Sequence, residues 1–428
     1  MSEEAYGRRS RVRIALRATA SWALKAAGKV LRTIKLRRMP GRWKRAAVVL
    51  FGDPGGRRAA DLRDRMHWYF GGRTGGEGPV FDLLLSGRMD GEEEVPGYLE
   101  PCLDRPLRGE VLALDEADLD TYDFLLAGRA RETARWPLLR RLDRVRTVDP
   151  AFQGGTALSS WELAMGRSVD ADAREGLLER SLENFRVLKE RTEGDEAVWV
   201  LGTGPSVEEM YGREVSGGTV IVCNSIVRNT RLLDHLGPAA VCFADEVFHF
   251  GPSRYAAAFR RDLLRTVRDH DCFAVTRPEG AALLLRHHPE LEERIIAVPA
   301  AAPDWTAPGE EDFRVRPTGN ILTFYMLPLA AALGETIRIG GSDGRRPEER
   351  YFWKHNPTVQ YEGLMKTAFE AHPAFFRDRV YTDYYAEHVR LLGRQLEWLE
   401  ERGHTIESVT HTYVPVLLQR AVSGGQQG

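Results

Sequence analysis

Two histidines in the C-terminal half of this 428-residue chain have the chemistry of a proton acceptor. His355 stands in an aromatic stretch, and His388 begins a segment whose leucines recur with helical spacing. Imidazole titrates near neutral pH, so it is uncharged often enough to take a proton and basic enough to hold it. Either side chain could act as a general base, and the alternative for His388 is an ordinary place on the surface of its helix.

A glycine turn follows an apolar run at residues 196–201. The turn reads Gly-Thr-Gly-Pro-Ser over residues 202–206, and a polar, helix-compatible stretch continues over residues 207–211. Glycines let the backbone approach a ligand closely, and the free N–H groups at a helix N-terminus can bind a phosphate. The pattern is compatible with a nucleotide site, and its structural alternative is a strand-to-helix turn with Ser206 as the N-cap.

Two more apolar runs end in polar residues. Residues 218–223 lead into Asn224, and residues 239–244 lead into Asp245. In open α/β sheets, ligands bind in the crevice at the carboxyl ends of the strands. We therefore expect Asn224 to reach a ligand there, with an Asx turn after the strand as the structural alternative.

From the glycine turn onward, the chain resembles the bacterial sialyltransferases and a related group of flagellin-modifying and pterin-diphosphokinase-like proteins. These also open with GxGPS, a strand ending in Asn and a further apolar strand. The resemblance continues at the small-residue turn of residues 316–320, which precedes an apolar helix. A strand over residues 336–341 then runs into Ser342-Asp343-Gly344, similar to both bacterial and animal sialyltransferases. Residues 1–190 show no such likeness.

The resemblance implies roles for both histidines. His388 stands where the bacterial family carries its catalytic histidine, and Glu387 or Asp383 would orient it. His355 stands where the animal enzymes have a functional histidine, in the aromatic stretch after the strand. One of the two would be the base and the other a phosphate partner.

The resemblance also implies groups that stabilise a leaving phosphate. Tyr351 falls where the bacterial pattern places one of two tyrosines, but glycine and arginine stand where the second is expected, soon after Asp343. Arg345 or Arg346 could replace it through charge and bidentate hydrogen bonds. The expected nucleotide contacts are Gly202, Thr203, Gly204, Pro205, Ser206, Asn224, Thr318, Gly319, Asn320 and Asp343.

A glycosyltransferase is the function that this resemblance implies. It would move a sugar, such as a nonulosonic acid, from a CMP-activated donor to a glycan, lipid-linked or protein acceptor, without a metal or another cofactor. A magnesium-dependent diphosphotransferase is the alternative, and Asp245 and Glu246 would then have to bind the metal. A non-catalytic nucleotide-binding protein is the third hypothesis.

The apolar runs predict an α/β protein with two Rossmann-like doubly wound domains, and the resemblance implies a sialyltransferase-like fold for the second. Short, continuous apolar runs are typical of parallel strands covered on both faces. In the first half they lie at residues 46–51, 80–85, 110–114, 122–126 and 145–148. The expected units are a basic amphipathic helix at 1–40, an α/β domain at 41–165, a connecting helix at 166–194, the nucleotide-binding domain at 195–417 and a flexible tail at 418–428.

The N-terminal segment is strongly basic, although the whole chain has a formal charge of only −2. Residues 8–45 contain no acid, and apolar residues recur among the cations near the helical period. Anionic lipid attracts such a helix, so we expect a cytoplasmic protein that touches the inner membrane face, with a solvated tail as the alternative. The small net charge disfavours nucleic acid as a partner, no segment is apolar enough to cross a membrane, and the four separated cysteines are expected to be reduced.

Overall fold

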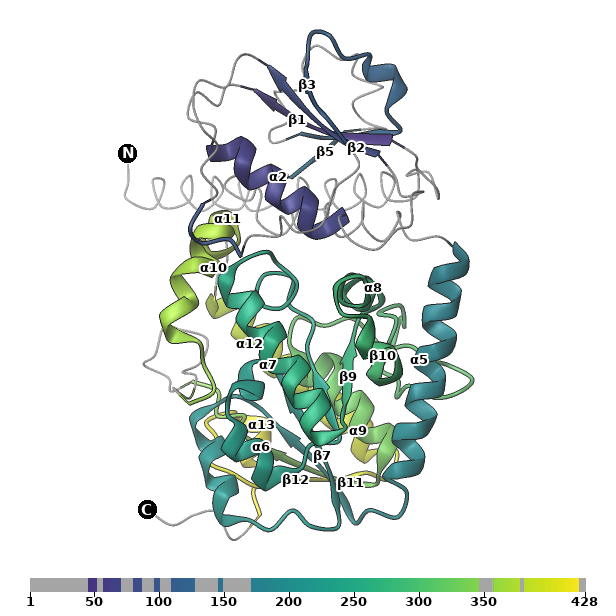
Figure 1. The fold of residues 1–428 in the computed structure, drawn as a ribbon. Helices are drawn as coiled ribbons and strands as arrows, with labels where there is room; N and C mark the ends of the chain where they lie inside the picture. The colour runs from purple at the N-terminus through teal and green to yellow at the C-terminus, as the bar shows by residue number, and fades with distance from the viewer. Residues whose placement is uncertain are drawn as a thin grey trace, which may run out of the picture.

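The computed structural model is an α/β protein with two sheets of parallel strands, which lie one beyond the other along the molecule (Figure 1). It describes residues 45–51, 57–70, 80–86, 96–100, 109–127, 145–148, 171–345, 356, 358–377 and 381–422. The basic helix expected before residue 41 lies outside these residues. Within them, no helix combines the length and the apolar composition that a membrane crossing needs.

The first sheet has the strand order β3-β2-β1-β4-β5, and every neighbouring pair is parallel. The chain starts in the middle of the sheet, moves outward to β3, and returns to the other side of β1. Each strand overlaps one of the predicted apolar runs. The bounds are β1 Arg45–Phe51, β2 Val80–Ser86, β3 Val111–Ala113, β4 Phe124–Ala127 and β5 Val145–Thr147, with helix α2 at Arg57–Phe70 and a 3-10 turn at Leu119–Thr121.

The second sheet has the parallel order β10-β9-β8-β7-β6-β11-β12. The chain enters at β6, steps outward to β10, and crosses back to β11 on the other side of β6. The winding direction reverses between β6 and β11, an arrangement compatible with a Rossmann-like doubly wound fold. The bounds are β6 Ala197–Leu201, β7 Gly218–Cys223, β8 Ala240–Cys242, β9 Phe273–Thr276, β10 Ile295–Ala297, β11 Thr336–Gly340 and β12 Thr405–Ser408.

Helices cover both faces of the second sheet. Successive side chains of a strand point to opposite faces, so Trp199 and Leu201 pack into one apolar cluster and Val198 and Val200 into another. Helices α6 (Thr230–Leu236), α7 (Arg254–His270) and α8 (Pro278–His287) complete the first cluster. Helices α5 (Ala171–Arg191), α9 (Leu327–Leu333), α12 (Tyr381–Glu400) and α13 (Pro415–Leu418) complete the second.

Short helical segments connect these elements. They are 3-10 helices η3 (Pro205–Gly212), η4 (Asn224–Arg228), η5 (Pro289–Arg294) and η7 (Glu362–Leu364), the π-helix η6 (Leu322–Met326), and the α-helices α10 (Met365–Ala371) and α11 (Pro373–Arg377). Most of them follow the carboxyl end of a strand or lead into a helix, so they shape the loops at one edge of the sheet.

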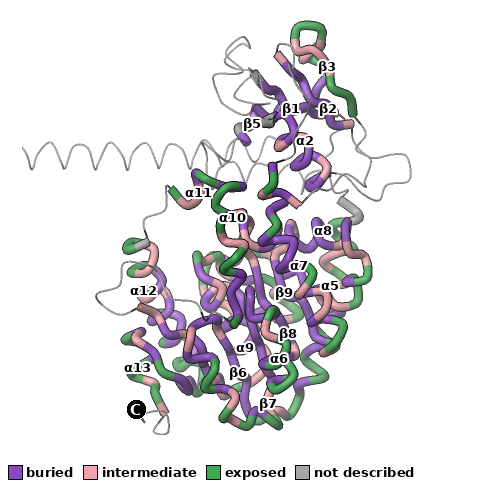
Figure 2. The backbone as a smooth tube through the Cα atoms, turned by 60° about the vertical axis from the view of Figure 1, so that its left-hand side comes forward, coloured by how far each residue is buried: buried purple, intermediate pink, exposed green. Residues whose placement is uncertain are grey.

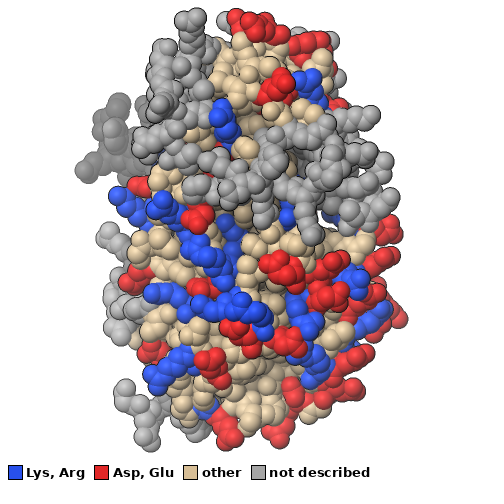
Figure 3. Space-filling view, in the orientation of Figure 1, with Lys and Arg blue, Asp and Glu red and all other residues tan. Residues whose placement is uncertain are grey.

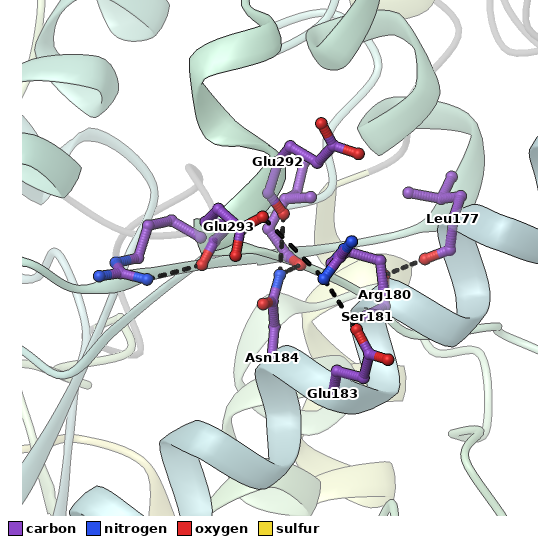
Figure 4. A network of polar contacts seen from close by, with 9 residues as sticks. Leu177, Arg180, Ser181, Glu183, Asn184, Glu292 and Glu293 are labelled. Carbon is purple, nitrogen blue, oxygen red and sulfur yellow. Dashed lines mark hydrogen bonds and ion pairs between the residues drawn. The ribbon is translucent and has the colours of Figure 1, made fainter.

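Helix α5 protects the outer edge of the second sheet, where strand β10 is the last strand of the described order (Figure 4). The amide of Asn184 donates to the carbonyl oxygen of Ile295 at 2.8 Å and to that of Glu292 at 2.9 Å. The N–H of Ala297 donates to the hydroxyl oxygen of Ser181 at 2.9 Å. A bare sheet edge invites pairing with another chain, and here the side chains of a helix satisfy its backbone groups instead.

Helix α2 joins the two halves of the molecule (Figure 2). The indole of Trp68 lies between the guanidinium of Arg260, 4.0 Å from the ring centre, and the imidazole of His287, stacked at 4.1 Å. Its Nε1 donates to the carbonyl of Phe250, in the loop after β8, at 2.6 Å. The buried guanidinium of Arg65 donates to the last carbonyl of α10 at 2.7 Å. The apolar cluster of α2 is continuous with one face of the second sheet, so the two sheets share a core.

Charged side chains of both signs mix on the face seen in Figure 3. Exposed ion pairs of the protein include Arg261 with Glu100 at 3.1 Å and Arg180 with Glu183 at 2.9 Å. Exposed pairs contribute little to the free energy of unfolding. Burial of apolar surface, rather than these pairs, therefore holds the elements together.

Replacing Asn184 by alanine should lower the free energy of unfolding by about 1–3 kcal/mol, because the buried carbonyl of Ile295 and the partly buried carbonyl of Glu292 lose their donor. Urea denaturation followed by circular dichroism measures this loss. The matched control is Arg180→Ala on the same helix, whose ion pair with Glu183 is exposed and should be worth at most about 0.5 kcal/mol. Equal losses in the two variants would contradict the role given to Asn184.

Candidate functional site

Two glycine turns meet where the second sheet reverses its winding. The N–H of Gly202 donates to the carbonyl of Gly340 at 2.9 Å, and the N–H of Gly204 donates to that of Gly341 at 2.8 Å. A Cβ on Gly202 would lie 2.5 Å from the oxygen of Gly341, which itself has a φ of +63°. Residues with a side chain do not fit this contact, so the glycines set how closely the ends of β6 and β11 approach.

A buried carboxylate fastens the two turns together. Asp343 accepts hydrogen bonds from the backbone N–H of Ser206 at 3.0 Å and from its hydroxyl at 2.7 Å, and that hydroxyl also lies 2.9 Å from the hydroxyl of Thr410. Burial raises the pKa of Asp343, and the bonds from Ser206 oppose that shift. Ser206 is not the N-cap, because Gly204 is the N-cap of η3 and Ser206 binds Asp343 instead. The turn does lead from strand β6 into this 3-10 helix, as the structural alternative expected.

A cavity opens beside these turns. Its empty space, including the part open to solvent, is about 530 Å³. It lies at the carboxyl ends of β6, β7 and β11, which is where doubly wound sheets bind ligands. The lining residues are Gly202, Thr203, Gly204, Cys223, Asn224, Asn320, Ile321, Leu322, Met326, Gly341, Ser342, Asp343, Gly344, His388, Leu392, Val414 and Leu417.

Asn224 combines an unusual backbone conformation with a side-chain oxygen that lacks a partner within the described residues. It has a φ of +49°, in the left-handed region that asparagine tolerates better than most residues. Its side-chain oxygen is buried and has no hydrogen-bond partner within the described residues. The Asx-turn alternative is therefore wrong, and an acceptor oxygen in the cavity wall stands ready for a donor on a ligand.

His388 lies in the cavity wall on the second turn of α12. Only 7% of its surface is exposed, so the alternative of an ordinary place on the helix surface is wrong. Burial lowers its pKa to about 4, so the imidazole is neutral at pH 7. Glu387, expected as a residue that orients it, is exposed and binds Arg390 through both carboxylate oxygens at 2.6 and 2.8 Å. Asp383 is also exposed.

The other predicted residues lie in four different places relative to the cavity and to the described residues. Asn320 lines the cavity, and Thr318 and Gly319 stand next to it: Thr318 lies 2.8 Å from the hydroxyl of Thr323, and a Cβ on Gly319 would come within 2.9 Å of Tyr384. Pro205 and Ser206 begin η3 behind the glycine turn. Tyr351, His355 and Arg346 lie outside the described residues. Arg345 directly follows the lining residue Gly344.

The sequence interpretation did not include two tyrosines that contact residues at or next to the cavity lining, or the apolar wall of the cavity. Tyr384 packs on Gly319, and the hydroxyl of Tyr385 would lie 2.9 Å from a Cβ on Gly344. The apolar wall includes Leu322 and Met326 of the π-helix η6, a type of helix that often occurs at functional sites. The signal available in the sequence was the helical period, which already puts Tyr384 and Tyr385 one turn before His388.

The acid pair after β8 is engaged within the protein. Asp245 accepts the N–H groups of Val247 and Phe248 at 2.8 and 3.0 Å, and Glu246 forms an ion pair with Arg277 at 3.0 Å. Among the described residues, no group of three or more His, Cys, Asp or Glu side chains is placed so that it could hold a metal ion.

Comparisons of the chain with protein-family models, with curated proteins and with solved structures find no match.

Replacing Gly204 by alanine should lower the free energy of unfolding by about 1–3 kcal/mol or more, because the new Cβ would lie 2.1 Å from Asp343. Thermal unfolding compares it with Gly212→Ala in the same 3-10 helix, where a Cβ meets no atom within 4 Å. The control should change stability by no more than about 0.5 kcal/mol. A well-tolerated Gly204→Ala would show that the two turns can separate without loss.

Acid should destabilise the protein through its buried histidines. Burial lowers the pKa of His388 and of His249 to about 4, whereas the unfolded chain takes up these protons near pH 6.5. Their stabilising contribution is therefore complete above pH 6.5 and is lost as the pH falls toward 4. His388→Leu should reduce the slope of unfolding free energy against pH by about 1 kcal/mol per pH unit between pH 6 and 4.5. Urea titrations across this range test it, and an unchanged slope would contradict the burial of a neutral imidazole.

Proposed function

We propose that the cavity binds the nucleotide part of a CMP-activated sugar and that the protein is a sialyltransferase-like glycosyltransferase. The observation that carries the proposal is the convergence of separate sequence blocks on one cavity. Gly202, Asn224, Asn320, Asp343 and His388 are far apart in the chain, and all five line it. The resemblance had assigned all of them to nucleotide binding or catalysis from their order alone.

The chemistry of the wall suits a nucleoside. Leu322, Met326 and Leu392 offer an apolar surface for a base, and the amides of Asn224 and Asn320 offer polar groups that fix its orientation. Among the described lining residues there is no lysine or arginine. A single phosphate at the edge of the cavity fits this wall better than a buried diphosphate, whose larger charge would need cations.

The proposed reaction is a substitution at the anomeric carbon of the donor sugar. The acceptor hydroxyl oxygen bonds to that carbon while the bond from the carbon to the phosphate oxygen breaks, and CMP leaves with the electron pair. The acceptor proton passes to His388, which is neutral and can take it. A bound phosphate anion near the imidazole would raise its pKa from about 4 and so make it a better base. In this proposal the transferred sugar is a nonulosonic acid and the acceptor is a glycan, lipid-linked or protein hydroxyl.

Calorimetric titration of the whole chain with CMP should show binding that does not depend on magnesium. Asn224→Gly keeps the left-handed backbone accessible while it removes the side chain, and it should weaken CMP binding by about tenfold or more, the usual value of a hydrogen bond to a buried amide. Asn229→Ala is the control, because Asn229 caps α6 instead of lining the cavity.

The same titrations separate the other hypotheses. Binding of ATP or AMP only with magnesium would favour the diphosphotransferase, even though Glu246 is already paired with Arg277. Failure of every nucleotide to bind would contradict the proposed site. Tight CMP binding that Asn224→Gly leaves unchanged would mean that the nucleotide binds elsewhere.

A further inference from the structure

An arginine and a tyrosine lie together at the edge of the cavity, and the inference drawn from them rests on the proposed function. The guanidinium of Arg345 lies over the ring of Tyr385, 4.7 Å from its centre. The backbone N–H of Arg345 points to the hydroxyl of Tyr385 at 3.5 Å. Both residues are half-buried, so neither is shut off from a ligand.

The cavity lies directly beside this pair. Arg345 follows Gly344, which lines the cavity, and Tyr385 precedes the lining residue His388 by three positions on α12. Residues three apart share one face of a helix. Gly344 has a φ of +72°, and a Cβ there would lie 2.6 Å from Val414 and 2.9 Å from the hydroxyl of Tyr385. The backbone that presents Arg345 is therefore closely confined.

The charge of Arg345 is available to an anion. Two other arginines of this half are paired with acids, Arg338 with Glu407 at 2.8 Å and Arg390 with Glu387 at 2.6 Å. Within the described part of the chain, Arg345 forms no ion pair. A guanidinium matches the oxygens of a phosphate with two parallel hydrogen bonds. An aromatic ring beneath it holds the group in place and limits its hydration.

We propose that Arg345 binds the phosphate of the nucleotide and that Tyr385 is the positioning residue that holds its guanidinium at the edge of the cavity. The apolar wall then binds the nucleoside, and the charge of the ligand stays outside that wall. The phosphate lies on the side of the cavity from which α12 presents His388, where the leaving group and the proton acceptor have to meet. We therefore expect that, among the described residues near the cavity, only Arg345 accounts for the contribution of the phosphate to CMP affinity.

Paired titrations with CMP and cytidine test the proposal, because the two ligands differ by one phosphate. The natural protein should bind CMP about 10- to 100-fold more tightly than cytidine, the usual range for hydrogen bonds to a charged group. Arg345→Gln should abolish most of this ratio and leave cytidine affinity unchanged. Tyr385→Ala should lower the ratio by about threefold to tenfold, and Tyr385→Phe, which keeps the ring beneath the guanidinium, should restore it.

The control is Arg402→Gln, because Arg402 stacks on Trp398 at 4.2 Å at the far end of the same helix and should leave the ratio unchanged. Equal affinity of the natural protein for CMP and cytidine would overturn this inference while leaving the nucleoside site intact. Binding of neither ligand would instead contradict the proposed function. If Tyr385→Ala weakens both ligands equally, Tyr385 is structural and the positioning role is wrong. Arg345→Gln and Tyr385→Phe, which alter only the edge of the cavity, keep the test decisive if Tyr385→Ala does not fold.

Discussion

Backbone meets backbone where β6 and β11 end, and the candidate site depends on that contact. With no side chain between them, Gly202 and Gly341 bring the two strand ends close enough for Asp343 to reach Ser206 across the sheet. The carboxylate tolerates burial because Ser206 supplies both of its donors. The reversal of winding at the same point leaves the space that the cavity occupies. The close packing of these two glycine backbones therefore fixes where the polar side chains around the cavity lie.

Apart from the Asp343 carboxylate, which Ser206 binds, the polar side chains that line the cavity are uncharged at neutral pH. His388 is neutral because of its burial, and Asn224 and Asn320 are polar without charge. Inside an apolar wall of this kind, hydrogen bonds and dipoles act more strongly than in water. Arg345 stands at the edge, where water can still share its charge. Such an arrangement avoids the cost of a buried unpaired cation and still offers one to an anionic ligand.

The sequence predicted the strands of the first sheet, α5, and most of the polar residues around the cavity. Strands buried on both faces are continuous apolar runs, so β1, β6 and β7 could be recognised directly. Strands β9 and β10 were not predicted, although they are as long as strands β3 to β5, which were. The edge of β10 is completed by Asn184, more than one hundred positions earlier. The link from Asp343 to Ser206 spans 137 positions, and the place of Tyr385 depends on how α12 packs. Neither leaves a local pattern in the chain.

Helix α2 is buried or partly buried along most of its length. None of its residues from 59 to 70 is exposed, and Trp68 is held by groups from both α7 and α8. A helix without an exposed residue over this stretch packs against its surroundings on most of its surface and is not a solvated connection between independent modules. The two sheets therefore do not form independent domains, because they share one apolar core. If the chain were cut between the two sheets, each fragment would expose an apolar surface that promotes aggregation. Because the sheets share a core, we expect the intact protein to unfold on heating in one cooperative step.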